Sequence, residues 1–93
     1  MATPYTDRDD QIKVIGTVQN KNGLRQVIVR VMESNEGARL LDIRTQKRDN
    51  PEGPWVTQWQ GISLTRSTAR EVVDLLQQNW DEIDELLFPR EAR

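Results

Sequence analysis

The change of hydrophobic period after Leu64 constrains this 93-residue chain more than any other feature. Before Leu64, turn-forming residues separate segments that are rich in β-branched residues or that alternate between apolar and polar side chains, which is the pattern of strands. After Leu64, apolar residues recur every three or four positions, as in an amphipathic helix. This order predicts an α+β domain in which four strands precede one long C-terminal helix (ββββα).

The connections between the predicted strands contain strong turn signals. Residues 20–23 end in Asn-Gly, which tolerates the positive φ angles of a tight hairpin. Residues 49–54 contain two prolines, which cannot donate ladder hydrogen bonds, and one glycine, so we expect a loop there. The predicted strands are residues 12–18, 25–33, 39–48 and 55–64.

Alternation along the second and third strands separates their side chains into two faces. One face carries Val27, Val29 and Val31 from the second strand and Leu41, Ile43 and Thr45 from the third. The other face carries Ile28, Arg30 and Met32 from the second strand and Asp42, Arg44, Gln46 and Arg48 from the third. The second of these faces is therefore predicted to hold most of the charge.

The fourth predicted strand contains two tryptophans. Its alternation places Trp55 and Trp59 on one face, opposite the apolar residues at the end of the strand. Gln58 and Gln60 would then lie among those apolar residues, which is unfavourable. A bulge near Gly61 would relieve this conflict, and we expect one.

The predicted helix begins after Thr65, a good N-cap, and ends before Pro89. At about 1.5 Å per residue it would be about 35 Å long, whereas a seven-residue strand spans about 23 Å. Its apolar stripe would extend beyond the sheet, so we expect a symmetric homodimer formed helix to helix; a C-terminal segment folded back under the sheet is the alternative. The predicted interface residues are Val73, Leu76, Trp80, Ile83 and Leu87.

The composition excludes most small-enzyme chemistry. The chain has no cysteine and no histidine, which excludes disulfides, zinc-finger spacings, cysteine nucleophiles and triads with an imidazole base. Carboxylates are plentiful, but those at positions 81, 82, 84 and 85 lie on the polar side of the predicted helix, with no pocket implied. We expect a protein that is not an enzyme and uses no cofactor or metal.

The net charge of −2 conceals an uneven distribution along the chain. Residues 11–70 hold ten basic and five acidic side chains, a net charge of +5, whereas residues 71–93 hold two basic and seven acidic ones, a net charge of −5. A basic sheet can attract phosphate locally although the whole chain is acidic. We expect residues 1–10 to be a flexible arm, 11–88 to be the domain and 89–93 to be a tail.

No segment approaches the roughly 18 consecutive apolar residues of a membrane-spanning helix, and residues 1–10 are polar and acidic rather than a signal-like leader. We therefore expect an intracellular protein without a membrane partner. Its location would be the cytoplasm or nucleoid in a bacterium and the nucleus in a eukaryote.

Four short motifs occur in a fixed order: Val-Ile-Val-Arg at 27–30, Leu-Asp-Ile-Arg at 41–44, Pro-Glu-Gly at 51–53 and Gly-Ile-Ser-Leu at 61–64. Together with four consecutive strands and a helix, they resemble the family of the transcriptional coactivator positive cofactor four and its bacterial relatives, over about residues 25 to 87. The resemblance implies a curved antiparallel sheet, a homodimer formed through the helices and non-catalytic binding of single-stranded DNA. It places Arg30 and Arg44 at DNA-contacting positions.

Binding of single strands needs positive charge that follows the phosphates and flat side chains on which bases stack. Family members carry aromatic residues where this chain has Met32 and the Thr-Gln-Lys-Arg of residues 45–48, so Trp55 or Trp59 is predicted to replace the missing platform. Lys13 would lie at the rim of this face. The predicted nucleic-acid contacts are Arg30, Arg44, Trp59, Trp55, Lys21, Arg25, Met32, Arg39, Gln46, Lys47 and Arg48.

Each of these residues also has a structural interpretation. The charges could be simply solvated, with Arg44 paired to Asp42 or Glu33 across the sheet. Trp55 and Trp59 could be core or dimer-interface aromatics, because tryptophan is usually largely buried. Both alternatives stay open at this point.

The leading prediction is a homodimer that binds single-stranded DNA with little sequence preference and supports transcription regulation, replication or repair. RNA is a second candidate ligand, and transcription or replication proteins are candidate partners. The alternative is a protein–protein interaction module of the transcription machinery with little direct nucleic-acid binding. In that case the two strand tryptophans would form a partner site, and the acidic C-terminal segment would recruit a basic protein.

Overall fold

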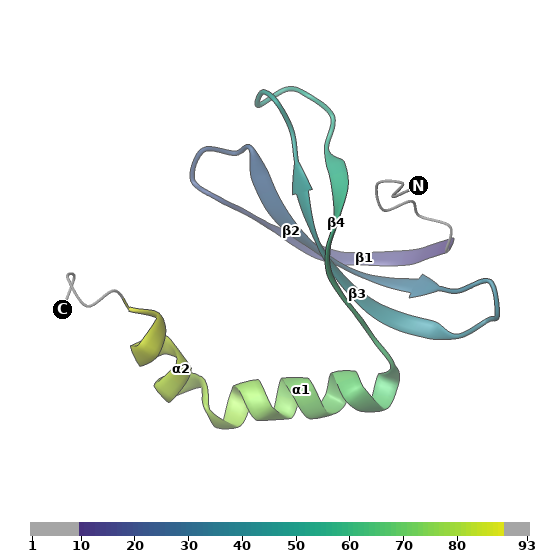
Figure 1. Ribbon diagram of the computed structural model, residues 1–93, viewed down its shortest axis with the longest axis vertical. Coiled ribbons are helices and arrows are strands. Elements are labelled where there is room, and N and C mark those ends of the chain that lie inside the picture. Colours follow the sequence, from purple (N-terminus) through teal and green to yellow (C-terminus); the bar gives the residue numbers. More distant parts are fainter. Residues whose placement is uncertain (1–9, 89–93) are drawn as a thin grey trace.

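The computed structural model describes residues 10–88 and contains four strands followed by two helices. The strands form one antiparallel sheet in the order β1-β2-β3-β4, so each strand pairs with its neighbour along the chain (Figure 1). This confirms the predicted α+β class and strand order. The elements are β1 (Asp10–Gln19), β2 (Arg25–Glu33), β3 (Arg39–Lys47), β4 (Val56–Leu64), α1 (Arg66–Gln78) and α2 (Trp80–Leu87).

The central pair, β2 and β3, is the most regular part of the sheet. Its register runs without interruption from Arg25 opposite Lys47 to Glu33 opposite Arg39. The β1–β2 turn has Gly23 at φ 72°, as the Asn-Gly signal predicted, and the Gly23 N–H donates to the Asn20 carbonyl at 3.1 Å. β1 is longer at both ends than the predicted residues 12–18. It pairs with β2 from Asp10 opposite Glu33 to Gln19 opposite Gln26, with two register shifts along the way.

The two faces of the sheet differ in burial. In the described part of the chain, every buried residue belongs to one face, which we call the buried face. The opposite, apolar face carries the valines of β2 together with Leu41, Ile43 and Ile62, and Ile62 is 48% exposed. The members of the buried face are Gln26, Ile28, Arg30 and Met32 on β2 and Asp42 and Gln46 on β3.

The bulge expected near Gly61 is present. Arg44 is opposite Gly61 and Gln46 is opposite Thr57, so residues 58–60 of β4 face a single residue of β3. Gly61 has φ +151°, which disfavours any other residue. A Cβ atom at this position would collide with the Ile43 carbonyl oxygen and would lie 2.7 Å from the Arg44 Cδ. Glycine is therefore required at position 61.

The prediction of one long helix over residues 65–87 is wrong, because Asn79 interrupts it with φ −118° and ψ 13°. The Asn79 side chain donates to the Leu75 carbonyl at 2.8 Å, a local bond of the kind that competes with helical backbone geometry. Asp81 and Glu82 then occupy the first turn of α2, where negative charge suits the helix dipole.

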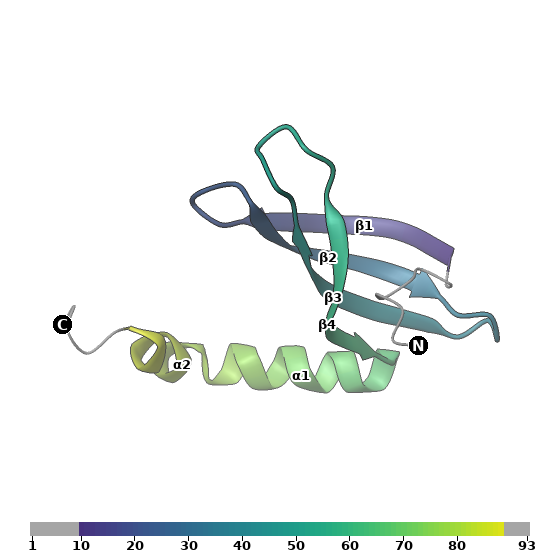
Figure 2. The same cartoon turned by 45° about the horizontal axis from the view of Figure 1, so that its top comes forward.

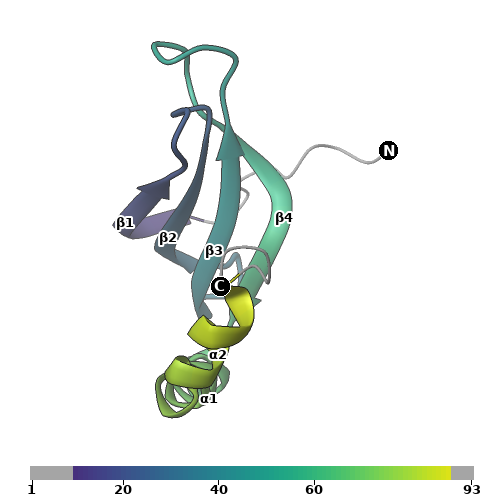
Figure 3. The ribbon, with the colours of Figure 1, turned by 90° about the vertical axis from the view of Figure 1, so that its left-hand side faces the viewer.

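The helices cover little of the sheet. Among the described elements α1 approaches β3 and β4, whereas α2 approaches only α1. Figures 1 and 2 show α1 leaving the end of β4 and continuing with α2 away from the strands. Figure 3 shows both helices at one end of the molecule, so most of the apolar face has no second layer. The alternative of a segment folded back under the sheet is not seen for residues 66–87.

Within residues 10–88, no helix is both long enough and apolar enough to span a membrane. Most of the predicted arm, and the whole of the predicted tail, lie outside the described residues.

Replacement of Gly61 by alanine tests the bulge. We expect Gly61→Ala to lower the free energy of unfolding by more than about 2 kcal/mol, because the positive φ and the collision with Ile43 act together. Urea unfolding followed by circular dichroism measures this. Gly16→Ala is the matched control: a Cβ there meets nothing within 4 Å, so its effect should stay within about 0.5 kcal/mol. Equal effects of the two substitutions would contradict the account.

Candidate nucleic-acid interface

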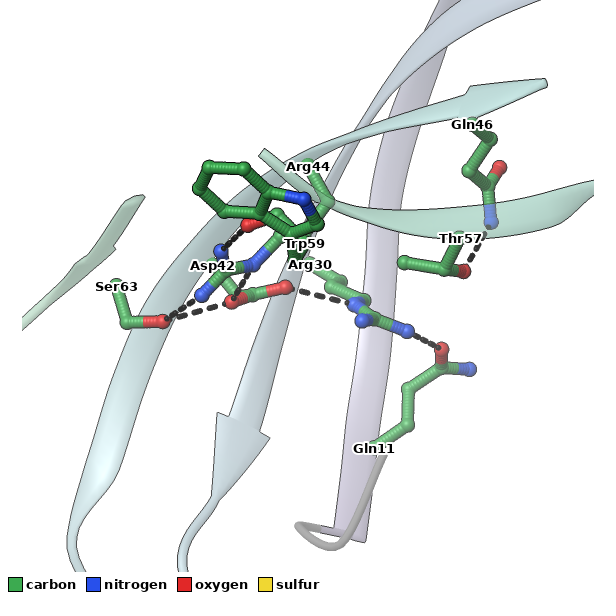
Figure 4. Close-up of polar contacts among 8 residues, drawn as sticks. All are labelled: Gln11, Arg30, Asp42, Arg44, Gln46, Thr57, Trp59 and Ser63. Atoms are coloured by element: carbon green, nitrogen blue, oxygen red, sulfur yellow. Dashed lines mark hydrogen bonds and ion pairs between the residues drawn. The ribbon is translucent and has the colours of Figure 1, made fainter. Parts of the chain in front are cut away.

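The Asp42 carboxylate is the centre of the buried face. It is 1% exposed, and its Oδ2 accepts a hydrogen bond from the Arg30 Nε at 2.9 Å. Its Oδ1 accepts from the Arg44 Nε at 3.0 Å and from the Ser63 hydroxyl at 2.8 Å (Figure 4). One buried carboxylate therefore links two guanidinium groups and joins β2, β3 and β4.

The Arg44 side chain crosses from β3 to β4. Its Nη1 donates to the Trp59 carbonyl at 2.6 Å, and its Nη2 donates to the Ser63 hydroxyl at 2.8 Å. Gly61 lies between these two acceptors in sequence and directly opposite Arg44 in the sheet. Because Gly61 has no side chain, the Arg44 chain can pass over it. The glycine of the Gly-Ile-Ser-Leu motif thus makes the Arg44 contacts sterically possible.

A second set of polar contacts extends across the buried face. The Gln26 amide donates to the Gln46 side-chain oxygen at 2.6 Å, and the Gln46 amide donates to the Thr57 hydroxyl at 3.0 Å. On the other side, the Arg30 Nη1 donates to the Gln11 side-chain oxygen at 3.3 Å. No buried side-chain polar atom in the described residues lacks a partner. Hydrogen bonds between side chains, as well as the packing of Ile28 and Met32, thus stabilise this face.

Four cations gather where the β1–β2 turn meets the β3–β4 loop. Arg25 and Lys47 are register partners, and both are exposed. The Arg48 Nε donates to the Gly23 carbonyl at 2.8 Å, which ties the end of β3 to the turn that carries Lys21. We call Lys21, Arg25, Lys47 and Arg48 the basic end; Asp49 and Glu52 of the following loop are its nearest acidic residues in sequence.

The two strand tryptophans have different surroundings. Trp55 precedes β4 and is half-buried, with the Arg48 guanidinium carbon 4.0 Å from its ring centroid, a cation–π contact. Trp59 lies in the bulge and is 67% exposed. Figure 4 shows its ring on the same side of the strands as the guanidinium groups of Arg30 and Arg44. In this structure Trp59 is therefore a surface aromatic, not a core residue.

The structure separates the predicted nucleic-acid contacts into two groups. Arg30 is 2% exposed and Met32 and Gln46 are also buried, so none of the three offers a surface to a bound strand in the single chain. Arg39 pairs with Glu33 at 3.6 Å at the opposite end of the sheet from the basic end. The residues that lie together at or near the basic end and the bulge are Lys21, Arg25, Lys47, Arg48, Trp55, Trp59 and Arg44.

The Arg44–Asp42 pair agrees with an alternative that the sequence leaves open, whereas the rest of the network does not follow from the sequence. The hydrogen bonds of Ser63, Thr57 and Gln11 cannot be predicted from the sequence, because they depend on the register between strands. One signal for the ion pairs is visible in the sequence. Asp42 and Arg44 are two residues apart, so they share one face of β3, and Arg30 lies on the same face of the neighbouring β2. Among the described residues, no group of three carboxylates is placed to hold a metal ion.

No protein-family model matches the chain, and no curated protein or solved structure matches it significantly. The resemblance to the positive cofactor four family therefore stays a prediction that rests on the sequence motifs.

The Asp42→Asn substitution measures what the buried carboxylate contributes. It keeps the side-chain shape but leaves the buried Arg30 and the partly buried Arg44 without their counter-charge, so we expect a loss of about 3 to 5 kcal/mol in the free energy of unfolding. Glu33→Gln, which disrupts the exposed pair with Arg39, is the control and should cost less than about 1 kcal/mol. Equal free energies of unfolding for the two variants in urea would contradict a structural role for Asp42.

Proposed function

We propose that this chain is a non-catalytic protein that binds single-stranded DNA as a homodimer, with little sequence preference, in support of transcription regulation, replication or repair. The observation that carries the proposal is the exposed Trp59 ring. Trp59 belongs to the β4 bulge, which lies along the strand between the basic end and the Arg44 contacts. Exposed aromatics beside positive charge are the two ingredients of sequence-tolerant single-strand binding. RNA offers the same stacking faces and phosphates and is a second candidate ligand.

In this proposal the two ingredients act on different parts of the strand. An unpaired base stacks on the Trp59 ring, which accepts any base because every base has a flat π face. The exposed side chains of Lys21, Arg25 and Lys47 neutralise phosphates and release counterions. Bases inside a duplex are already stacked on one another, so the arrangement favours single strands.

The distribution of charge supports binding along the sheet rather than the helices. Residues 10–64, which form the sheet and its loops, hold eight basic and six acidic side chains, a net charge of +2, whereas residues 71–93 carry a net charge of −5. A polyanion is therefore attracted to the sheet and repelled by the C-terminal segment. This division directs a bound strand towards the basic end.

The homodimer follows from apolar surface that one chain leaves uncovered. Leu76 is 44% exposed and Trp80 is 51% exposed in the helices, and the apolar face of the sheet is also largely uncovered. Monomeric soluble proteins rarely expose contiguous apolar patches of this kind. In the proposed dimer, the helices of two copies pack through Val73, Leu76, Trp80, Ile83 and Leu87.

DNA binding is tested with a fluorescent oligothymidylate titrated with the full chain at several salt concentrations. We expect log affinity to fall with log salt at about −0.7 per phosphate contact. Trp59→Ala should lose about 1 to 3 kcal/mol of binding free energy, one stacked base, whereas Gln60→Ala beside it should bind like the wild type. A flat salt titration, or full affinity in Trp59→Ala, would be evidence against the proposal.

The dimer is tested by sedimentation velocity. The wild type should sediment as two 10.8-kDa chains, and Leu76→Glu should sediment as one chain because the carboxylate would be buried in the interface. Gln77→Glu introduces the same charge at the neighbouring exposed position and should remain dimeric. A wild-type monomer, or a dimer in Leu76→Glu, would exclude this interface.

A further inference from the structure

Arg44 differs in its contacts from the exposed cations of the basic end, which are the proposed phosphate ligands. We infer that Arg44, held by Asp42, is a positioning residue for the Trp59 platform and not a phosphate ligand; this inference rests on the proposed function. It differs from what the resemblance implies, which is direct contact between Arg44 and DNA.

The Arg44 guanidinium is already bonded within the chain through all three of its nitrogen atoms. Each of its three nitrogen atoms donates to an acceptor: Nε to Asp42, Nη1 to the Trp59 carbonyl and Nη2 to the Ser63 hydroxyl, at 3.0, 2.6 and 2.8 Å. These bonds engage three of the five guanidinium N–H groups and fix the plane of the group, so a phosphate would have to fit the orientation that they set. Asp42 also neutralises part of the Arg44 charge, which reduces counterion release on binding.

Arg44 contacts β4 at the bulge. Residues 58–60 face only one residue of β3, so the bulge interrupts the regular ladder there. The bond from Arg44 to the Trp59 carbonyl supplies a cross-strand tie within this interruption. The second bond, to Ser63, fixes the same guanidinium beyond Gly61. Arg44 thus holds the backbone that carries the exposed indole at Trp59, within the bulge, and at Ser63, beyond its C-terminal end.

A preorganised Trp59 ring would favour binding of a base. A stacking platform that is fixed before binding loses less conformational entropy when a base arrives. Asp42 orients Arg44, and Arg44 restrains the bulge. These contacts therefore contribute to binding through base stacking on Trp59. The exposed cations of the basic end supply the electrostatic contribution.

The test compares Arg44→Lys with Lys47→Ala on the full chain. Lysine keeps the charge but cannot reproduce the three-way fork, so Arg44→Lys should weaken oligothymidylate binding by about tenfold at every salt concentration and leave the salt slope unchanged. Lys47→Ala should instead reduce the magnitude of the salt slope by about 0.7. Wild-type affinity in Arg44→Lys, or a slope reduced by about 0.7 in Arg44→Ala, would overturn the inference.

A second measurement needs no DNA and separates this inference from the proposed function. The ¹H–¹⁵N heteronuclear NOE of the Trp59 indole and of the amides of residues 58–60 should fall in Arg44→Lys relative to the wild type. An unchanged NOE would refute positioning by Arg44. If Arg44→Lys does not fold, Ser63→Ala removes one acceptor of Arg44, keeps its charge and should lower the same NOE. A wild type that binds no oligothymidylate would refute the proposed function while the NOE still reports on positioning.

Discussion

The Asp42 carboxylate is the interaction on which the rest of the sheet depends. It is the register partner of Arg30 on β2, it bonds Arg44 two residues along β3, and it accepts from Ser63 on β4. A slip of one residue between β2 and β3 would move Asp42 and Arg44 together to the opposite face and leave the Arg30 guanidinium without its carboxylate partner. The ion pairs therefore specify the register as well as contribute to stability, and the apolar side chains of the sheet alone would specify it less sharply.

The same network explains why the two faces of the sheet have different tasks. The buried face is satisfied within one chain, because its polar atoms find partners on neighbouring strands. Most of the apolar face and of the helix surface is not covered, because α1 contacts only β3 and β4 and α2 does not reach the sheet. In the proposed dimer a second copy covers the exposed helix stripe. The basic end and Trp59 belong to β1–β4 and remain available in that arrangement.

Local patterns in the sequence predict the local structure well. The alternation of residues 25–33 predicts β2 with its observed bounds, and the Asn-Gly pair predicts the turn before it. The bulge follows from the position of Gln58 and Gln60 between apolar neighbours. These features depend on residues close together in the chain, so they are visible without the fold.

Features that depend on residues far apart are harder to predict. The break at Asn79 is hidden because the apolar stripe continues from Leu76 to Trp80 across it, and only the competing side-chain bond of Asn79 marks the end of α1. The burial of Arg30 was missed because it depends on a partner twelve residues away whose position is set by the register. The exposure of Trp59 is likewise hard to predict, because it depends on the bulge. Residues 58–60 face a single residue of β3, and the Trp59 side chain projects from this irregular segment.

The most direct measurement of the central claim is a ¹H–¹⁵N NMR titration of the full chain with oligothymidylate. We expect the resonances of the Trp59 indole and of the backbone amides of residues 58–60 and of the basic end to shift. The resonance of the Arg30 Nε–H, which is bonded to buried Asp42, should not shift, and neither should those of the acidic α2. Shifts confined to α1 and α2, or no shifts with DNA in excess, would contradict the central claim.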